Sequence, residues 1–310
     1  MGKKFSILIT TKNRIQDLSF TLNKIQYLLD REDVVCLICD DGSTDGTFEY
    51  IQNNFPQIQL IKNFKSKGLI YSRNRLLDLV VSEFAISIDD DLHFITQNPL
   101  GSIETAFRKN PKIGLIGFRI YWNLNEPEIT KSYAVSHRMK SFVGCGHVWR
   151  MSVWREIPDY PEWFVFYGEE DFASYQLFKK NWEIHYLPEV LVNHRVDIKS
   201  RKKGSDYSIR LRRSLRSGWY LYLLFLPYSL IPRKMSYSIW MQLKLKVFKG
   251  DWDVLAALLL AMKDLVFALP KILKSSNRLT KAEYKSYQEL ADTRLYWNPE
   301  DELQQNNNRA

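Results

Sequence analysis

Residues 84–91 read Phe-Ala-Ile-Ser-Ile-Asp-Asp-Asp, a short apolar run that ends abruptly in three adjacent carboxylates. Aspartate is depleted in strands, so a cluster of three is better explained by chemistry than by folding. Packed like charges repel one another, and a hard divalent cation held by carboxylates and substrate phosphates would offset that repulsion. The alternative is a solvated corner between a strand and a loop. We therefore place Asp89, Asp90 and Asp91 at the centre of a candidate site.

The chain before this triplet alternates between short apolar runs and segments with helical periodicity. Such a βαβ series implies a parallel sheet with right-handed crossovers, and ligands bind at the carboxyl ends of the strands in such sheets. Polar segments follow three of the runs, as that rule requires. The predicted strands are residues 5–10, 34–39, 58–61 and 84–88, and the predicted helices are residues 14–29, 44–53 and 68–80.

The composition is that of a globular protein. The chain has 310 residues, 45% hydrophobic and 14% aromatic, so it can bury a large core. Three cysteines and a polar N-terminus predict a reducing compartment, without disulfides or a signal peptide. Cys36 and Cys39 form a C-x-x-C pattern, but they lie in an apolar run where their side chains are expected on opposite faces of a strand, which argues against a zinc site.

The net charge of +9 is concentrated in one C-terminal segment. Residues 195–275 contain 17 Lys and Arg against 5 Asp and Glu, whereas the rest of the chain is slightly negative. The same segment holds apolar runs at 219–226, 254–260 and 265–273, each too short or too interrupted to span a membrane. Basic and apolar side chains together are typical of helices that lie on anionic lipid, and we predict such a contact. The alternative is helices packed on the main domain; nucleic-acid binding is a weaker explanation, because no reading motif accompanies the charge.

Six motifs occur in a fixed order between residues 5 and 195. Each alone is weak, and the second could be an Asx-rich turn that caps a helix. They are Thr10-Thr11-Lys12-Asn13-Arg14, the DDGSTDGT run of residues 40–47, Ser72-Arg73-Asn74, Asp89-Asp90-Asp91, Gly168-Glu169-Glu170-Asp171 and His194. Their order and spacing resemble glycosyltransferase family 2, whose members have the GT-A fold. The resemblance implies an α/β fold with a mostly parallel nucleotide-binding sheet flanked by helices.

The resemblance assigns roles to the loops of the first half. Thr10, Asn13 and Arg14 match the first loop of the family's nucleotide pocket. Asp41 matches the acid that hydrogen-bonds the base of the nucleotide. These residues are therefore expected to bind the donor.

The triplet matches the family's DxD motif. Asp89 and Asp91 match its two acids, of which one faces the ribose or sugar and the other binds the metal that bridges the diphosphate, and Asp90 is counted with the nucleotide-binding residues. Arg73 matches a basic residue near the nucleotide, with Lys67 as a less secure neighbour. A bound Mg or Mn ion would stabilise the charge that develops on the diphosphate leaving group.

The acids of residues 168–171 match the family's general base. Their structural alternative is a helix start, where the macrodipole favours carboxylates. The residues that follow depart from the family pattern, which leaves two alignments open: the base is Glu170 without a gap and Asp171 with one. We slightly favour Asp171, because Glu-Asp is the commoner order.

The second half also supplies candidates for metal and acceptor binding. His194 follows a run that matches the family's strand leading to a metal-binding or phosphate-contacting histidine, and His93 is a possible substrate contact beside the triplet. The segment 144–150 resembles the family's glycine-containing acceptor loop. Tryptophans able to stack on a sugar face are Trp149, Trp154 and Trp163, although core packing is their commoner role.

The function predicted from these residues is metal-dependent, inverting transfer of a sugar from a nucleotide-diphosphate sugar to a hydroxyl of a glycan or polyprenyl-linked acceptor, of a bacterial polysaccharide or glycolipid type. The predicted location is cytoplasmic, on the inner face of the cell membrane. The alternatives are a non-catalytic nucleotide-sugar or glycan-binding scaffold and, less favoured, a sugar nucleotidyltransferase, which would need a glycine-rich loop where residues 10–14 have no glycine. The motifs do not identify the sugar, nucleotide, acceptor or linkage.

The predicted domain organisation follows the motifs and the charge. Residues 1–200 form the GT-A domain, with a nucleotide-sugar half at 1–98 and an acceptor half at 99–200. Residues 201–275 form the basic helical region. Residues 276–310 are expected to be a frayed polar tail.

Overall fold

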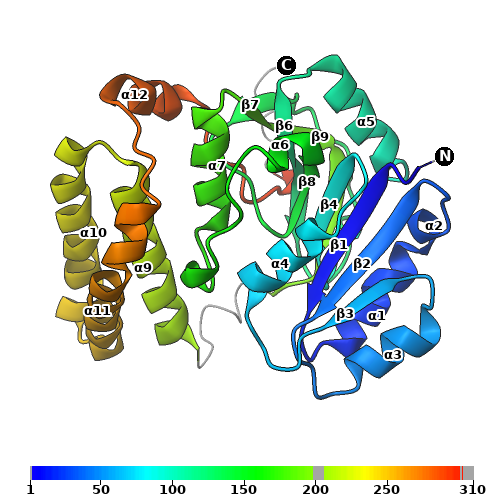
Figure 1. Cartoon of the computed structure of the whole chain (residues 1–310), viewed down its shortest axis with the longest axis horizontal. Helices are drawn as coiled ribbons and strands as arrows, with labels where there is room; N and C mark the ends of the chain where they lie inside the picture. Colours follow the sequence, from blue (N-terminus) through cyan, green and yellow to red (C-terminus); the bar gives the residue numbers. More distant parts are fainter. Residues whose placement is uncertain (1, 198–205, 301, 303–310) are drawn as a thin grey trace.

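A nine-stranded mixed sheet forms the centre of the computed structural model, which describes residues 2–197, 206–300 and 302 (Figure 1). The strand order is β3-β2-β1-β4-β8-β6-β9-β5, and β7 pairs with β9 outside that path. Strands β3, β2, β1 and β4 are parallel, whereas β8 is antiparallel to both of its neighbours. The strands are β1 Phe5–Thr11, β2 Val34–Asp40, β3 Gln59–Lys62, β4 Phe84–Asp89, β5 Leu92–Phe94, β6 Ile113–Trp122, β7 His137–Met139, β8 Gly146–Arg150 and β9 Glu183–His194.

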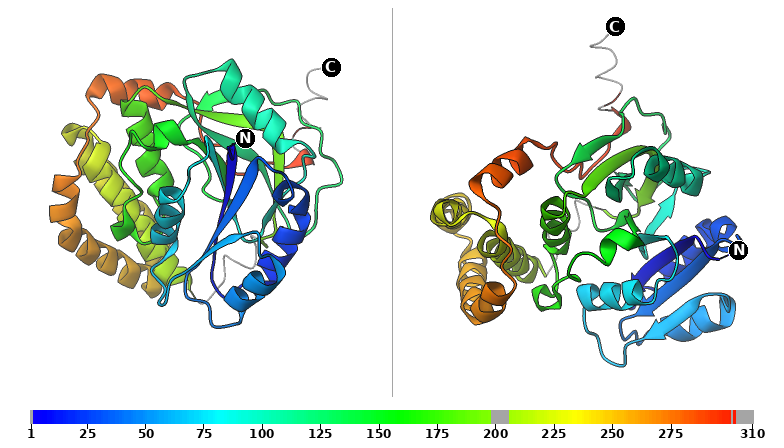
Figure 2. Two further views of the ribbon diagram at one scale, coloured as in Figure 1. Left: turned by 45° about the vertical axis from the view of Figure 1, so that its right-hand side comes forward. Right: turned by 45° about the horizontal axis from the view of Figure 1, so that its top comes forward.

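Helices connect the strands and cover both faces of the sheet (Figures 1 and 2). The elements predicted for residues 5–88 are confirmed, except that the first predicted helix is divided in two at Ile25. The helices are α1 Ile15–Lys24, α2 Gln26–Leu29, α3 Thr47–Asn54, α4 Leu69–Asp78, α5 Pro99–Lys109, α6 Met151–Trp154, α7 Glu169–Lys179, α9 Tyr207–Phe225, α10 Ile231–Leu245, α11 Trp252–Lys274 and α12 Lys281–Glu289.

Two apolar layers, one on each face of the sheet, explain why the early strands read as continuous apolar runs. One layer contains side chains of α1, α3 and α5, and the other contains side chains of α4, α6 and α7. Cys36 belongs to the first layer and Cys39 to the second, so the two thiols lie on opposite faces as predicted. A strand buried on both faces has no solvated side that would favour alternating polar residues.

The register of the parallel strands brings their polar ends together. Thr11 at the end of β1 lies opposite Asp40 of β2, and Thr10 lies opposite Asp89 of β4. The first loop, the residue 40–47 loop and the aspartate triplet therefore meet at the carboxyl edge of the sheet. This is the edge where ligands bind in open α/β sheets.

Strand β9 delivers the last motif to the same edge. Its final residue, His194, pairs with Leu92 of β5 and lies opposite Trp122 at the end of β6. Because β5 begins directly after the triplet, this pairing places His194 beside Asp91 although more than a hundred residues separate them in sequence.

Helices α9, α10 and α11 form a layer beyond α7, on the side away from β1 to β3 (Figure 1). Leu215 and Trp219 of α9 pack with Val254 and Leu258 of α11 in a cluster of their own. The backbone carbonyl of Asp264 also accepts a hydrogen bond from the Tyr220 hydroxyl at 3.1 Å. Among the described residues, no helix is both long and apolar enough to cross a membrane.

The segment after α11 is folded, and the prediction of a frayed tail is wrong for residues 276–300. Helix α12 begins with a capping box between Thr280 and Glu283, and Tyr287 packs on Tyr175 with ring centroids 4.7 Å apart. Trp297, only 3% exposed, lies against the guanidinium of Arg119. The end of the predicted tail, residues 303–310, and the start of the basic region, residues 201–205, lie outside the described residues.

Candidate active site

The middle aspartate of the triplet is bonded to the end of β1 and to the loop that follows it. Thr11 donates a hydrogen bond to Oδ2 of Asp90 at 2.8 Å, and Nε of Arg14 lies 3.4 Å from Oδ1. Asp90 is 5% exposed, and burial raises the pKa of its carboxyl to about 7 although Arg14 opposes the shift. Asp90 therefore ties β1 to β4, and because it also lines the cleft with Asp89 and Asp91, its contact with the nucleotide stays a prediction.

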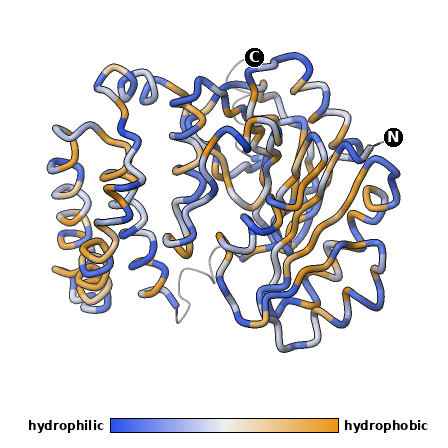
Figure 3. The backbone as a smooth tube through the Cα atoms, viewed as in Figure 1, coloured by the Kyte–Doolittle hydropathy of each residue, from blue (hydrophilic) through white to orange (hydrophobic). Residues whose placement is uncertain are grey.

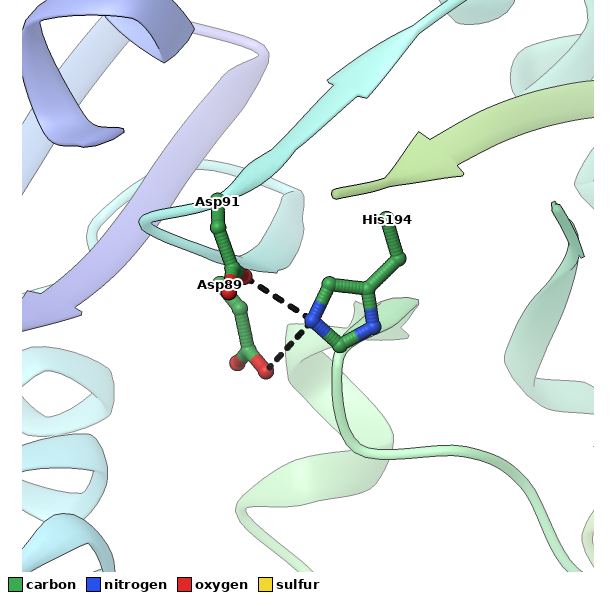
Figure 4. A group of neighbouring side chains, drawn as sticks. All are labelled: Asp89, Asp91 and His194. Atoms are coloured by element: carbon green, nitrogen blue, oxygen red, sulfur yellow. Dashed lines mark ion pairs between the residues drawn. The ribbon is translucent and has the colours of Figure 1, made fainter. Parts of the chain in front are cut away.

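Asp89, Asp91 and His194 converge on one point (Figure 4). Nε2 of His194 lies 2.8 Å from Oδ1 of Asp91 and 3.9 Å from Oδ2 of Asp89. The three possible ligand atoms all lie within 4.8 Å of one another. The ring of His194 is held by Trp122, whose ring centroid is 4.2 Å away.

The charge around Asp91 keeps it ionised. Burial raises the pKa of its carboxyl, but His194 and Arg14 outweigh burial and hold the pKa at about 2. Arg14 donates from Nη2 to Oδ2 of Asp91 at 2.7 Å and to Asp17 at 2.9 Å. A carboxylate that stays charged over the whole neutral range can bind a cation without first losing a proton.

The donor set fits a hard divalent cation. Oδ1 of Asp91 is buried and accepts no hydrogen bond within the described residues, although Nε2 of His194 lies at ion-pair distance from it. Nδ1 of His194 is also buried without a hydrogen-bond partner among these residues. Two carboxylates and one imidazole around one point are ligands that Mn²⁺ accepts, and Mg²⁺ is bound by one or two carboxylates together with substrate phosphates.

The three acids line a cleft of about 380 Å³, and two arginines stand beside them. Arg195 was not predicted: its backbone N–H donates to the carbonyl oxygen of Asp91 at 2.9 Å, and its guanidinium donates to Thr21 at 2.8 Å. Arg14 and Arg195 thus give the cleft positive charge next to its candidate metal ligands, which suits an anionic group such as a diphosphate. The sequence offers one indication that Arg195 belongs to the site, which is its position directly after His194.

Arg73 links the DxD acids to the acid-rich helix. Its guanidinium donates to Asp89 at 3.1 Å, to Glu169 at 3.0 Å and to the carbonyl oxygen of Gly144 at 2.9 Å. Arg73 is 5% exposed, so it contacts the site from inside the protein. A Cβ on Gly144 would come too close to the carboxylate of Glu170 and to the guanidinium of Arg73, so a larger residue there would have to displace one of these side chains.

The three acids of α7 differ in their surroundings. Glu169 is buried against Arg73, whereas Glu170 and Asp171 line a second hollow of about 360 Å³. Burial and the neighbouring Glu169 raise the pKa of Glu170 to about 8, with Arg73 opposing them. Asp171 is exposed to solvent, but the protein packed around the hollow raises the pKa of its carboxyl, and Ser141 opposes this shift.

The predicted nucleotide loop is built around Asp41. Its carboxylate accepts hydrogen bonds from the backbone N–H groups of Lys67 and Gly68 at 2.8 and 2.9 Å, from Ser66 at 2.6 Å and from Asn63 at 2.8 Å. A carboxylate has about four acceptor positions, so all of them are used within the protein. A base contact by Asp41 would therefore have to replace one of these bonds.

The other residues predicted to bind the nucleotide, Thr10, Asn13 and Lys67, lie in or beside the loops that follow β1 and β3. Thr10 is at the end of β1, and Asn13, with a positive φ of 53°, accepts a hydrogen bond from the backbone N–H of Thr44 at 2.7 Å. Asn13 thus joins the first loop to the residue 40–47 loop. The backbone N–H of Lys67 binds Asp41, and the Lys67 ammonium lies 6.0 Å from the centroid of the Tyr71 ring.

Several other candidates belong to the core. Trp149 and Trp154 are buried and pack with Tyr160, so their proposed stacking on a sugar is wrong. Trp163 packs against Tyr220 of α9. His93 is also buried, with Nε2 3.0 Å from Glu126 and Nδ1 2.9 Å from Arg195, so both ring nitrogens are occupied. The sequence pattern predicts that aromatic rings lie on strands and helices, but it does not distinguish rings that pack in the core from rings that bind a sugar.

The model of the family described as "Glycosyl transferase family 2" matches residues 6–183, more than half of the chain. The chain belongs to glycosyltransferase family 2. Among curated protein sequences no significant match is found. The match ends inside β9, so α9 to α12 lie outside the family domain.

Solved glycosyltransferase structures share the fold at low sequence identity. One is a crystal structure of GalNAc-T7 with UDP, GalNAc and Mn²⁺, at 14% identity, a TM-score of 0.56, and coverage of 72% of this chain and 48% of that one. Another is the mannosyltransferase PcManGT from Pyrobaculum calidifontis in complex with GDP-Man and Mn²⁺, at 15% identity, a TM-score of 0.54, and coverage of 92% and 83%. A third is S. aureus TarS, at 14% identity and a TM-score of 0.52, with coverage of 71% and 40%.

The glycosyltransferase assignment rests on the family domain, and the structural matches show its GT-A fold. The alignment spans about half or less of two of these three structures, so the substrates of those proteins do not transfer to this chain. The site residues must be argued from their own geometry.

Proposed function

We propose that this glycosyltransferase transfers a sugar from a nucleotide-diphosphate sugar to a hydroxyl group, with a divalent cation and with inversion at the anomeric carbon. The observation that carries the proposal is the convergence of Asp89, Asp91 and His194 at the mouth of a cleft that also holds Arg14. The family membership of the chain supports the same reaction. Structures of the shared fold contain Mn²⁺ with UDP or with GDP-Man, which supports a nucleotide donor.

The donor cleft orients the leaving group. Asp89, Asp91 and His194 would hold Mg²⁺ or Mn²⁺, and the ion would neutralise charge on the departing diphosphate. Arg14 and Arg195 stand at the same cleft and would hold the phosphates through charge-assisted hydrogen bonds. Thr10, Asn13, Lys67 and the loop ordered by Asp41 would contact the nucleoside. Arg73 fixes Asp89 in place from behind.

Glu170 is the better placed of the two candidate bases. Its carboxylate meets Arg73 above Gly144, on the side that leads to Asp89. Asp171 instead interacts with Ser141, with Tyr175 on α7 and with Tyr222 on α9. No described residue donates a hydrogen bond to the Glu170 side chain, so it is available to take the proton of an acceptor hydroxyl.

The proposal includes contact with an anionic membrane through one face of α11, which we call the α11 apolar face. Large apolar side chains recur along α11 at helical spacing and are exposed, whereas helix α9 covers the opposite side of α11. Figure 3 shows hydrophobic residues in the helical layer to which α11 belongs. Exposed lysines Lys263, Lys271 and Lys274 accompany them. The α11 apolar face consists of Trp252, Leu259, Leu260, Val266, Phe267 and Leu273. An acceptor carried by a lipid would be consistent with this contact.

Nucleotide release from UDP-, GDP- and dTDP-sugars, with Mn²⁺, with Mg²⁺ and with EDTA, tests the reaction. Turnover of one donor that EDTA abolishes and Asp91→Asn lowers by about a hundredfold or more would support it. Glu104→Gln, on exposed α5 far from the cleft, should retain full turnover. NMR of the product anomer tests inversion. Metal-dependent nucleotide binding without turnover of any donor would favour a binding scaffold instead.

A further inference from the structure

Within the part of the chain that the structure describes, the imidazole of His194 has no hydrogen bond at Nδ1, which is buried. Its other nitrogen, Nε2, is directed at Asp91 at 2.8 Å (Figure 4). A histidine that binds a metal normally donates its second ring N–H to a carboxylate, a carbonyl oxygen or a water molecule, and that bond sets the orientation of the ring. Among the described residues, packing therefore has to orient this ring.

Trp122, the last residue of β6, supplies that packing. It lies opposite His194 in the register of β6 and β9, so the two side chains project from the same face of the sheet. Their ring centroids are 4.2 Å apart, and the ring planes are inclined by 49°. Trp122 does not line the cleft that contains Asp91 and His194, so its effect on a bound ion has to pass through the imidazole.

A segment from the end of the chain also contacts Trp122. We call residues 291–297 the C-terminal strap, which follows α12 and lies beyond the family domain. The indole N–H of Trp122 donates to the carbonyl oxygen of Leu295 at 2.8 Å, and the ring centroid of Tyr296 is 5.5 Å from that of Trp122. The strap therefore restrains the ring that packs on His194.

The strap has anchors of its own. The backbone N–H of Trp297 donates to the carbonyl oxygen of Ile120 at 3.0 Å, and the Trp297 ring centroid lies 4.4 Å from the guanidinium of Arg119. These contacts do not involve the side chain of Trp122. A substitution at Trp122 should therefore leave the strap in place on β6.

We propose that Trp122 is a positioning residue of the metal site, which orients the imidazole of His194, and that the C-terminal strap acts on the bound ion through Trp122. The inference rests on the proposed function, because it requires a divalent cation at Asp89, Asp91 and His194. Trp122 itself touches neither the ion nor the donor. A segment beyond the family domain thus contributes to the affinity of the donor site for its metal.

Binding of Mn²⁺, alone and together with UDP or GDP, tests the proposal. Electron paramagnetic resonance measures free Mn²⁺, and electron spin echo modulation of the bound ion shows whether an imidazole nitrogen is a ligand. Trp122→Leu removes the ring, whereas Trp122→Phe keeps a ring and removes only the hydrogen bond to the strap. Tyr296→Ala, at an exposed position, weakens the strap contact without opening the core and serves if Trp122→Leu does not fold.

Trp182→Leu is the matched control. The indole N–H of Trp182 also donates to a partner, Glu156 at 3.0 Å, and Trp182 directly precedes β9, at the end of that strand opposite to His194. Thermal unfolding of every variant shows whether it is folded at the temperature of the binding experiment.

The wild type and Trp182→Leu are expected to bind Mn²⁺ with nitrogen coupling. Trp122→Leu should bind Mn²⁺ about tenfold or more weakly and lose the coupling, because the carboxylates remain but the imidazole is no longer oriented. Trp122→Phe and Tyr296→Ala should keep the coupling with a smaller loss of affinity.

The possible contrary results are distinct. Unchanged affinity and coupling in Trp122→Leu would overturn the inference and leave the proposed function intact. Wild-type affinity in both Trp122→Phe and Tyr296→Ala would overturn the part assigned to the strap. Bound Mn²⁺ without nitrogen coupling in the wild type would overturn the ligand role of His194 and the inference with it. Failure of the wild type to bind Mn²⁺ under any condition would contradict the metal-dependent reaction itself.

Discussion

Arg73 and Glu169 form a buried ion pair of 3.0 Å between α4 and the first residue of α7, with side chains 6% and 3% exposed. The same guanidinium reaches Asp89, so the metal side of the site and the acid-rich helix share one cation. One buried side chain therefore connects the end of β4 with the start of α7. It also makes both carboxylates dependent on Arg73 for charge compensation.

Removal of Arg73 should therefore destabilise the fold. Arg73→Met leaves Glu169 buried without a partner, and loss of one member of a buried ion pair costs about 3–5 kcal/mol. Arg31→Met is the matched control, because its pair with Asp33 is largely exposed and should contribute about 1 kcal/mol or less. Urea denaturation measures both. The double variant Arg73→Met with Glu169→Gln should recover part of the loss, and a strictly additive loss would contradict the coupling.

Transfer should gain activity as the pH rises through the pKa of Glu170. The carboxyl has to be ionised to act as a base, and its pKa is raised from the ordinary 4.5 to about 8. The rate constant kcat/KM is therefore expected to climb between pH 7 and 9. Glu170→Gln should lower transfer by about 10²–10⁴-fold and remove this limb, whereas Asp171→Asn should keep it. A limb retained in Glu170→Gln and lost in Asp171→Asn would move the base to Asp171.

The same raised pKa fixes the sign of a stability effect. Between pH 4.5 and 8 the folded protein holds a proton on Glu170 that the unfolded chain has released, so its contribution to stability falls as the pH rises. Glu170→Gln cannot ionise, and its unfolding midpoint should fall less steeply with pH than that of the wild type. Thermal unfolding at pH 6 and pH 9 compares the slopes, and identical slopes would contradict a raised pKa in the folded state.

The sequence predicts the parts of the site that lie next to one another in the chain. The apolar run before Asp89 and the polar loops after β1 and β2 require only local pattern and the rule for parallel strands. The contact of His194 with Asp91 depends on pairing between β5 and β9, and that of Arg73 with Glu169 on the packing of α4 near α7. Local pattern contains no information on such long-range contacts.

In the C-terminal segment, the sequence predicts disorder where the structure is folded. Residues 276–300 look polar, but the buried side chains that hold them, Tyr287 and Trp297, are few and widely spaced. Their partners, Tyr175 and Arg119, lie on elements more than a hundred residues earlier. A segment held by a few long-range contacts has no periodicity by which sequence could identify it.

Trp297 should accordingly anchor this segment. Its indole N–H donates to Glu302 at 2.7 Å and its ring covers Arg119, so Trp297→Ala removes both contacts and about 3–5 kcal/mol of local stability. Amide hydrogen exchange over residues 280–300 should then rise while that of β1 and β4 stays slow. Leu124→Ala, an exposed control at 61%, should change neither. Unaltered exchange in Trp297→Ala would show that other contacts hold the segment.

The α11 apolar face could contact a membrane or a second copy of the chain, and the two contacts can be told apart by experiment. Phe267 is 73% exposed and Val266 63%, and lysines accompany them along the helix, so binding to a bilayer should need both apolar side chains and anionic lipid. The wild type is expected to sediment with vesicles containing phosphatidylglycerol and much less with phosphatidylcholine alone. Val266→Ser with Phe267→Ser should lose this binding, whereas Val81→Ser, 86% exposed on another part of the molecule, should keep it. Equal binding to neutral and anionic vesicles would contradict a role for the lysines. A concentration-dependent dimer that the same double variant abolishes would assign the face to a second copy of the chain.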